Sequence, residues 1–197
     1  MMILQSWKLS EDIVISHLDK FDHRIHELVK KNFDHIYPIL KWREYLNENS
    51  TKKLNDLNSN LENRNRIDVG VFHNEELIGW SYGWQGGMES GTYYMANSCI
   101  LPEFRRKGLY SKLLDTVIEI SKKTGYQTIT SRHVSGNNPV IIAKLKAGFK
   151  ITGFEMSEIH GHLIHLTYFH NKLRGEAFDV RSGMIKPKTD LVKNLYL

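Results

Sequence analysis

The sequence contains one cysteine, Cys99, and this scarcity excludes an internal disulfide framework and a cysteine-based zinc site. It also lacks a long apolar run, because no segment approaches the roughly 20 residues needed to span a bilayer. The apolar start is short and is soon followed by Trp7, Lys8 and Glu11, which is not the pattern of a signal peptide. We therefore expect a cytoplasmic protein with neither a membrane segment nor a metal site.

The composition is that of an ordinary globular protein, with 197 residues, 41% hydrophobic and 25% charged. This length fits one domain with a full core. The formal net charge of +5 suits an anionic ligand, such as a nucleotide cofactor, and would also suit nucleic acid. Charge alone does not choose between these ligands.

Hydrophobic periodicity predicts the secondary structure from about Asp22 onward. One helix extends toward Pro38, and a second covers about 51–61 with Ser50 or Thr51 as its N-cap. The later elements are strands over 67–72, 78–84 and 92–101, a helix from about 110 to a cap at Gly125, a strand over 127–132, a helix over 139–147, and strands over 149–156 and 161–169. Residues 13–18 fit a short strand or a turn of helix, and residues 171–197 fit loops with a terminal helical turn.

This order predicts an α/β fold of the mixed α+β kind, in which a twisted, mostly antiparallel sheet has six to seven strands. The strand–helix–strand segment over 94–132 predicts one parallel, right-handed crossover, and we expect helices on both faces of the sheet. A single domain over 1–197 would have its core at 67–169, N-terminal helices within 20–62 and a C-terminal extension over 171–197.

The second strand of the predicted hairpin has a strongly aromatic face. Ile78, Trp80, Tyr82 and Trp84 alternate with small residues, which places these side chains on one face of a strand. Sheet core is the ordinary role for such residues. Trp84 lies nearest the following glycine-rich turn and is the best candidate among them for a substrate contact.

The most informative segment is a basic turn between a strand and a helix. Its residues in order are Ile100, Leu101, Pro102, Glu103, Phe104, Arg105, Arg106, Lys107, Gly108, Leu109, Tyr110 and Ser111. The first N–H groups of a helix are unpaired and lie at the positive end of its dipole, so they attract phosphate. Gly108 would allow close approach of the ligand, and the three cations would add charge.

This segment resembles the acyl-CoA signature of the GNAT superfamily, Arg/Gln-x-x-Gly-x-Gly/Ala after a strand that ends in Val/Ile-x-Pro. The sequence supplies Ile100 and Pro102, followed by Arg105 and Gly108. Tyr110 departs from the pattern, because glycine or alanine is usual there. Its place on the apolar helical stripe favours a ring turned onto the buried face of the helix.

A second segment also resembles this family, whose pattern is Asn-x-x-Ala-x-x-x-Tyr-x-x-x-Gly-Phe. Asn137 matches the asparagine, and Gly148 with Phe149 matches the final pair. Lys144 stands where the family often has a tyrosine that protonates the departing thiolate. A solvated lysine is the ordinary interpretation of Lys144, but beside a cofactor it could bind a phosphate or stabilise a thiolate. The two segments identify residues 67–169 as similar to the GNAT fold.

The resemblance implies an N-acetyltransferase with acetyl-CoA as co-substrate, in which an amine attacks the thioester directly. The N-terminal helices would cover the acceptor side. Main-chain groups from Ser98 to Leu101 would hold the pantetheine arm and polarise the carbonyl. The implied cofactor-binding residues are Ser98, Cys99, Ile100, Leu101, Arg105, Arg106, Lys107, Gly108, Leu109, Tyr110, Ser111, Asn137, Asn138 and Lys144.

No residue of the sequence is singled out as the general base that the amine requires. Glu89 in the glycine-rich turn, Tyr94 in the strand before the phosphate turn and His133 at the end of the next strand are the three candidates. Cys99 is expected to be a buried structural thiol rather than a nucleophile.

Other functions remain open at this point. The acceptor could be a small amine or a protein amino group, and a homodimer is plausible. The same fold could instead bind acyl-CoA without turnover, as a sensor. A nucleic-acid-binding module is a remote alternative, because the basic residues do not form one stripe and the aromatic residues do not follow an RNA-recognition pattern.

Overall fold

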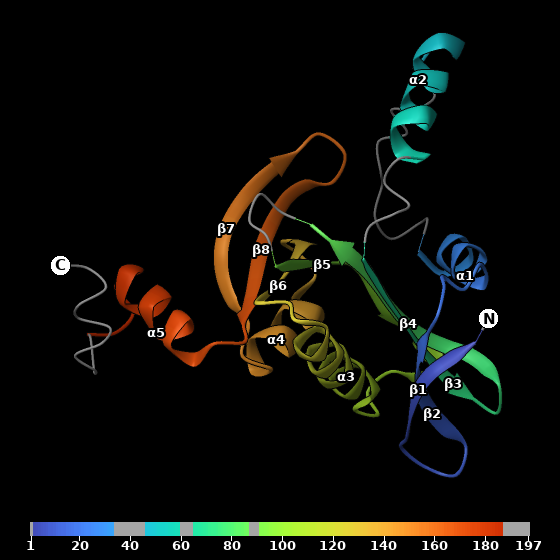
Figure 1. Cartoon of the computed structure of the whole chain (residues 1–197), viewed down its shortest axis with the longest axis horizontal. Helices are drawn as coiled ribbons and strands as arrows, with labels where there is room; N and C mark the ends of the chain where they lie inside the picture. Colours follow the sequence, from blue (N-terminus) through green and yellow to red (C-terminus); the bar gives the residue numbers. More distant parts are fainter. Residues whose placement is uncertain (1, 34–45, 60–64, 87–90, 187–197) are drawn as a thin grey trace.

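The computed structural model describes residues 2–33, 46–59, 65–86 and 91–186, whose strands form one mixed sheet (Figure 1). The strand order is β1-β2-β3-β4-β5-β6-β8-β7. The strands are β1 (Ile3–Lys8), β2 (Ile13–Leu18), β3 (Arg66–His73), β4 (Glu76–Gln85), β5 (Thr92–Ile100), β6 (Thr128–Val134), β7 (Lys150–Ser157) and β8 (Gly161–Phe169). Neighbouring strands are antiparallel except β5 and β6, which the predicted crossover makes parallel.

The described residues contain eight strands, whereas the sequence predicted six to seven. The additional strand is β1, an edge strand whose side chains are almost all exposed. It therefore shows no period-two alternation of apolar and polar residues that could reveal it. Segment 13–18, for which the sequence allowed a strand or a turn of helix, is strand β2 and pairs antiparallel with β1.

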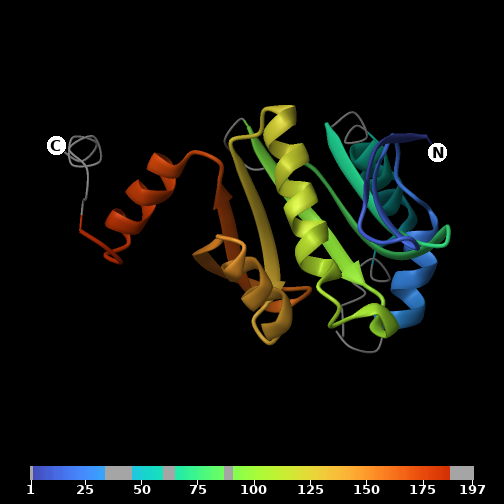
Figure 2. The same cartoon turned by 90° about the horizontal axis from the view of Figure 1, so that it is seen from below.

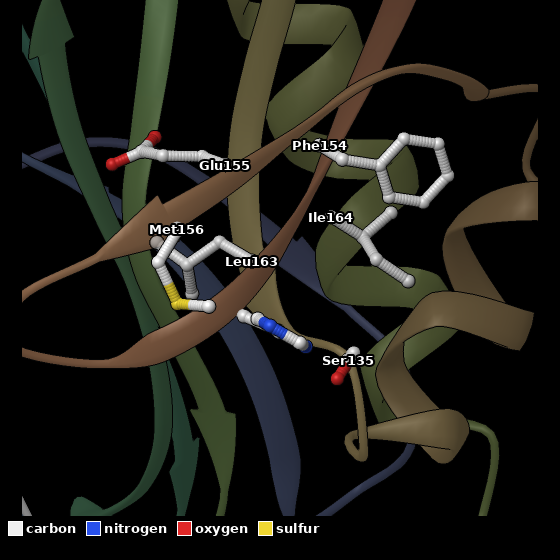
Figure 3. A pocket seen from close by; sticks show the side chains of 7 residues that line it. Ser135, Phe154, Glu155, Met156, Leu163 and Ile164 are labelled. Carbon is white, nitrogen blue, oxygen red and sulfur yellow. The ribbon is translucent and has the colours of Figure 1, made fainter.

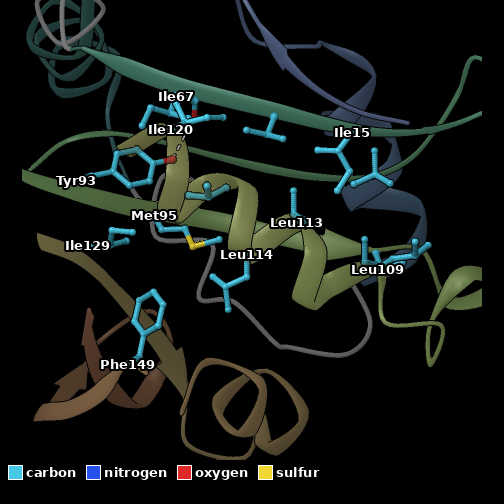
Figure 4. Packing of buried hydrophobic residues seen from close by; sticks show 14 of the residues in the cluster. Ile15, Ile67, Tyr93, Met95, Leu109, Leu113, Leu114, Ile120, Ile129 and Phe149 are labelled. Atoms are coloured by element: carbon cyan, nitrogen blue, oxygen red, sulfur yellow. Dashed lines mark hydrogen bonds between the residues drawn. The ribbon is translucent and has the colours of Figure 1, made fainter. Parts of the chain in front are cut away.

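Helices cover both faces of the sheet, as predicted. Helix α3 (Leu109–Thr124) lies across one face (Figure 2), where it packs on β3, β4 and β5. The main core lies beneath α3 and is extended by α4 (Asn138–Lys146) and by Phe149 (Figure 4). A second cluster joins Ile25 of α1 (Arg24–Phe33) to Trp80 of β4 on the opposite face.

Two helices differ from the prediction. Helix α2 (Glu48–Ser59) begins before the predicted caps, because the Asn47 carboxamide accepts the Ser50 N–H at 2.9 Å. Asn47, not Ser50 or Thr51, therefore caps this helix. Helix α5 (Lys172–Arg181) forms where loops were expected and extends beyond the end of β8 (Figure 1). The predicted terminal helical turn lies outside the described residues.

Two register shifts move side chains between the layers. A shift between β3 and β4 leaves Ile78 without a partner residue, so Ile78 joins the core under α3 while Trp80 packs on the α1 side. The predicted common face for Ile78 and Trp80 is therefore wrong. A second shift, between β4 and β5, leaves Ala96 without a partner residue. Met95 points into the core under α3, whereas Asn97 accepts a hydrogen bond from the Trp80 indole on the other side.

Candidate active site

The parallel strands β5 and β6 are paired only at their N-terminal ends. The last paired residues are Tyr94 and Thr130, although β5 continues to Ile100 and β6 to Val134. A gap therefore opens between residues 95–100 and 131–134, and we call it the β5–β6 split. Main-chain groups along its edges have no strand partner across the gap, so they can bind an extended ligand. This is the divergence that the sequence predicted near His133.

The end of β5 leads through a short 3-10 helix (Pro102–Phe104) into the turn before α3. Gly108 is the N-cap of α3 and has a left-handed φ of 74°, while Arg106 has a φ of 61°. A Cβ added to Gly108 would meet no atom within 4 Å, so the space before the helix start is open. The unpaired N–H groups of the first turn and the helix dipole make this opening favourable for an anion.

The three cations of the turn have different surroundings. Arg105 folds back along β5, where its Nε donates to the Ile100 carbonyl at 2.9 Å. Its Nε is thus engaged with the strand, while the residue as a whole is exposed next to the turn. Arg106 and Lys107 are exposed beside the helix start, with the Lys107 Nζ 5.4 Å from the centre of the Phe104 ring.

Cys99 lies beside this folded arginine. Burial raises the pKa of its thiol to about 11, against the smaller opposing effect of Arg105. The sulfur also donates to the Ile100 carbonyl at 3.2 Å. A protonated thiol of this kind is not a nucleophile at neutral pH, which agrees with the structural role expected from the sequence.

The side chain of Tyr110 is turned into the core, although glycine or alanine is usual at this position of the family pattern. Its ring packs against the core under α3, and its hydroxyl lies 2.9 Å from the Ser98 hydroxyl of β5. Burial raises the Tyr110 pKa to about 12, so the phenol stays neutral. The ring therefore leaves the helix start open. Leu109 is buried in the same core, while the adjacent Ser111 is exposed.

The start of α4 lies at the end of β6. Asn137 is the N-cap of this helix, and its side chain makes no capping hydrogen bond. The main-chain N–H of Asn137 donates to the Val134 carbonyl, which holds Asn137 and Asn138 next to the β6 edge of the split. The second segment that resembles the GNAT family therefore begins at the β6 edge of the split.

Lys144 is not solvated, which corrects the ordinary interpretation of its position. Its exposed fraction is 0%, and its Nζ lies 3.2 Å from the Met95 Sδ and 5.1 Å from the centre of the Phe149 ring. Gly148, with a φ of 94°, ends α4 and lets the Phe149 N–H bond back to the Lys144 carbonyl. Burial lowers the pKa of the Lys144 amine to about 7.

His133 faces the same side of the sheet as Lys144. Its Nε2 lies 3.1 Å from the Ser131 hydroxyl. Burial, and then the charge of Lys144, lower the His133 pKa to about 3. The imidazole is therefore neutral at pH 7 and is a weak proton acceptor, which disfavours it as the general base.

The opposite side of the split carries Tyr94, Trp84 and Arg132. The Arg132 Nε donates to the Tyr94 hydroxyl at 3.2 Å, and the rings of Tyr94 and Trp84 meet edge to face at 5.7 Å. Glu155 of β7 accepts from Arg132 at 3.0 Å and lies 2.7 Å from His165. Sequence reasoning missed Met95 and Arg132, because only the strand pairing places them at the split. Glu89 lies outside the described residues.

A cavity of about 480 Å³ lies elsewhere, on the β7–β8 hairpin (Figure 3). Phe154, Met156, Leu163 and Ile164 line it together with Ser135 from the loop after β6. Since β6 stands between β5 and β8, this cavity and the split are on opposite sides of one strand. Glu155 of β7 also lines this cavity and accepts a hydrogen bond from Arg132, so the cavity adjoins the side of the split that carries Tyr94 and Arg132.

In the part of the chain that the structure describes, no group of three or more histidine, cysteine, aspartate or glutamate side chains could hold a metal ion. None of the described helices is long and apolar enough to cross a membrane.

Comparison with known families accounts for this arrangement. Residues 23–149 match the Acetyltransferase (GNAT) family, so more than half of the chain is covered. The chain belongs to the GNAT acetyltransferase family. No curated protein sequence matches it.

Solved structures share the GNAT fold at low sequence identity. An acetyltransferase from Bacillus subtilis in complex with CoA is 15% identical, with a TM-score of 0.56 over 80% of this chain and 98% of that one. A GNAT family acetyltransferase from Elizabethkingia anophelis with acetyl-CoA bound is also 15% identical, with a TM-score of 0.57 over 81% of this chain and 99% of that one. At such identity the likeness establishes the fold alone.

Proposed function

We propose that this GNAT protein is an N-acetyltransferase that transfers the acetyl group of acetyl-CoA to a primary amine. The observation that carries the proposal is the β5–β6 split, which opens beside a helix start suited to phosphate. An extended thioester arm could bond to the free edges of β5 and β6 while its diphosphate lies at Arg106, Lys107 and Gly108. Two proteins of the same fold have been solved with CoA and with acetyl-CoA bound, which supports a CoA thioester as the ligand.

The two sides of the split suit the two substrates. The phosphate turn, Asn137 and Lys144 belong to the α3 and α4 side, so CoA would approach there. Trp84 and Tyr94 lie on the other side, with α1, and the amine would enter there. Direct attack in such a complex depends mainly on holding the amine near the carbonyl.

The proton that the amine loses requires an acceptor. Among the described candidates Tyr94 is on the amine side, whereas His133 faces Lys144 and has a lowered pKa. We therefore favour a path through the Tyr94 hydroxyl, which Arg132 orients, and ordered water. Trp84 would contact the body of the acceptor, whether a small amine or a protein amino group.

A non-catalytic acyl-CoA-binding domain is the second candidate, because Lys144 replaces the usual tyrosine. Turnover separates the two functions. Calorimetric titration with acetyl-CoA should give binding in the micromolar range, and a panel of amines followed by free-thiol release should show turnover. Binding without release of thiol for every amine would favour the sensor, while no binding of acetyl-CoA would reject both functions.

A further inference from the structure

The amine side of the split carries a row of aromatic rings. The row runs from Phe21, which precedes α1, through Tyr82 and Trp84 of β4 to Tyr94 of β5, with neighbouring ring centres 5.0, 6.5 and 5.7 Å apart. All four side chains are half-buried, so each ring keeps an accessible part. The row ends at Tyr94, where β5 and β6 separate. Such a surface suits a flat, apolar group of the acceptor.

Two arginines of the protein already occupy the faces of these rings. The guanidinium carbon of Arg66 lies 5.8 Å from the centre of the Trp84 ring, and that of Arg132 lies 5.3 Å from the centre of the Tyr94 ring. An aromatic face attracts a cation, and here the protein supplies that cation itself. A further positive charge on the acceptor would therefore be repelled from the row.

The carboxylates bound to these arginines are also engaged. Asp68 is buried and binds Arg66 at 2.8 Å. Both oxygens of Glu155 accept from the Nη1 of Arg132, at 3.2 and 3.0 Å, and one of them lies 2.7 Å from the Nε2 of His165. Hydrogen bonds from Arg132 and then from His165 lower the pKa of Glu155, so this carboxylate stays ionised and bound at neutral pH. Neither carboxylate is therefore available to hold a polycationic acceptor.

Arg132 keeps a hydrogen-bond donor that is directed to no group of the protein. Its Nε donates to the Tyr94 hydroxyl at 3.2 Å and its Nη1 to Glu155, which together fix the plane of the guanidinium. Its Nη2 has no hydrogen-bond partner within the described residues, and the side chain is 43% exposed. Arg132 also lies two residues beyond Thr130, the last residue of β6 that pairs with β5. A fixed guanidinium with free N–H groups beside the split is suited to a carboxylate.

We infer that the acceptor is a free amino acid with an aromatic side chain, an inference that names the substrate class of the proposed function and rests on it. The carboxylate of the amino acid binds the Nη2 of Arg132, and its ring packs on Trp84 and Tyr94. These two contacts hold the α-amine beside the split. A peptide N-terminus lacks the carboxylate, and a polyamine adds positive charge, so both are poorer acceptors.

The reaction yields an N-acetyl amino acid and CoA. The amine nitrogen bonds to the carbonyl carbon, and the carbon–sulfur bond breaks with its electron pair on sulfur. The sulfur takes one proton, and a second proton of the original ammonium goes to water.

The test compares four acceptors by the release of free thiol at saturating acetyl-CoA. They are L-phenylalanine, L-phenylalaninamide (which stands for a peptide N-terminus), 2-phenylethylamine and spermidine. The value of kcat/KM should be highest for phenylalanine. It should be lower by about 10- to 100-fold for the two aromatic amines without a carboxylate, because they lose a charged hydrogen bond. Spermidine should be the poorest of the four.

Two variants then separate recognition of the carboxylate from a structural role of the ion pair. Arg132→Gln should lower the ratio of kcat/KM for phenylalanine to that for phenylalaninamide by about 10- to 100-fold. Glu155→Gln breaks the same ion pair but leaves the guanidinium, so it should keep or raise the ratio. Both substrates react by the same chemistry, so the ratio cancels any effect on Tyr94. Arg181→Gln, an exposed change on α5, is the control and should match wild type.

Arg132→Met repeats the comparison if the glutamine variant does not fold. A ratio that is unchanged in the Arg132 variant, or that falls equally in Glu155→Gln, would overturn the inference. Preference for one of the other three acceptors, or reaction of none of the four, would also overturn it. In each of these cases the proposed function stands if another amine is acetylated. If acetyl-CoA does not bind, the proposed function and this inference both fail.

Discussion

Lys144 occupies a position of α4 that faces the sheet, together with Ile141, while Ile142 and Leu145 remain partly exposed. A lysine in the interior must lose the hydration of its amine, and this loss is the cause of its lowered pKa. The same residue therefore makes the stability of the fold depend on pH.

Replacing Lys144 with methionine should stabilise the protein at neutral pH, on the order of a few kcal/mol, because the desolvated charge is removed. Below pH 7 the lysine is charged in both states and its full cost is present. Between about 7 and the ordinary value of 10.5, the native state releases its proton first, so the cost falls as pH rises. The advantage of Lys144→Met should therefore shrink over this interval.

Urea unfolding of wild type and Lys144→Met at several pH values measures this dependence, with Lys146→Met as the control. A stability difference that does not change between neutral and alkaline pH would contradict a lowered pKa. In that case the stability difference between wild type and Lys144→Met would come from the packing of the methionine side chain.

At the scale of elements, the turn before α3 concentrates the features that suit phosphate. Arg106 has a φ of 61°, a left-handed conformation that glycine adopts without strain. Arg106→Gly should therefore lower the affinity for acetyl-CoA about tenfold while the melting temperature stays equal or rises. Lys112→Ala is the matched control, because Lys112 is an exposed cation one turn further along α3.

Calorimetric titration and thermal unfolding of both variants check this prediction. Equal affinities for wild type and Arg106→Gly would show that Arg106 does not contact the cofactor. A similar loss for Lys112→Ala would show that the total charge of the helix matters rather than the turn.

At the scale of the whole molecule, the split divides the sheet into β1–β5 and β6–β8, which are joined by only three residue pairs of parallel strand. A ligand that bonds to both edges would act as a missing strand segment. Saturating CoA should slow hydrogen exchange of the amides in 95–100 and 131–134 that face the split. At a hundredfold excess over Kd, the global stabilisation should be about 2.7 kcal/mol.

Hydrogen exchange measured by mass spectrometry, with and without CoA, tests this prediction, and β3 serves as the internal control because it is paired on both sides. Protection confined to the β7–β8 hairpin would place the ligand in the cavity near Phe154 instead.

The sequence by itself determined what depends on local chemistry. The turn ending at Gly108, the amphipathic stripe of α3 and the alternation in β3 each reflect contacts between residues close in the chain. They sufficed to predict the mixed sheet and the turn that precedes α3. Tyr110 was placed correctly for the same reason, because helical spacing alone puts its ring on the stripe.

Only the tertiary structure decided what depends on how the elements meet. Helix α4 is apolar on several sides, so its sequence does not indicate that Lys144 rather than Ile142 faces the sheet. The pairing of β5 with β6 brings Tyr94 to Arg132 on one side of the sheet, and the packing of α4 brings Lys144 to Met95 on the other. The residues of these two contacts are 38 and 49 positions apart in the sequence. A local hydrophobic period cannot indicate contacts at such sequence separations.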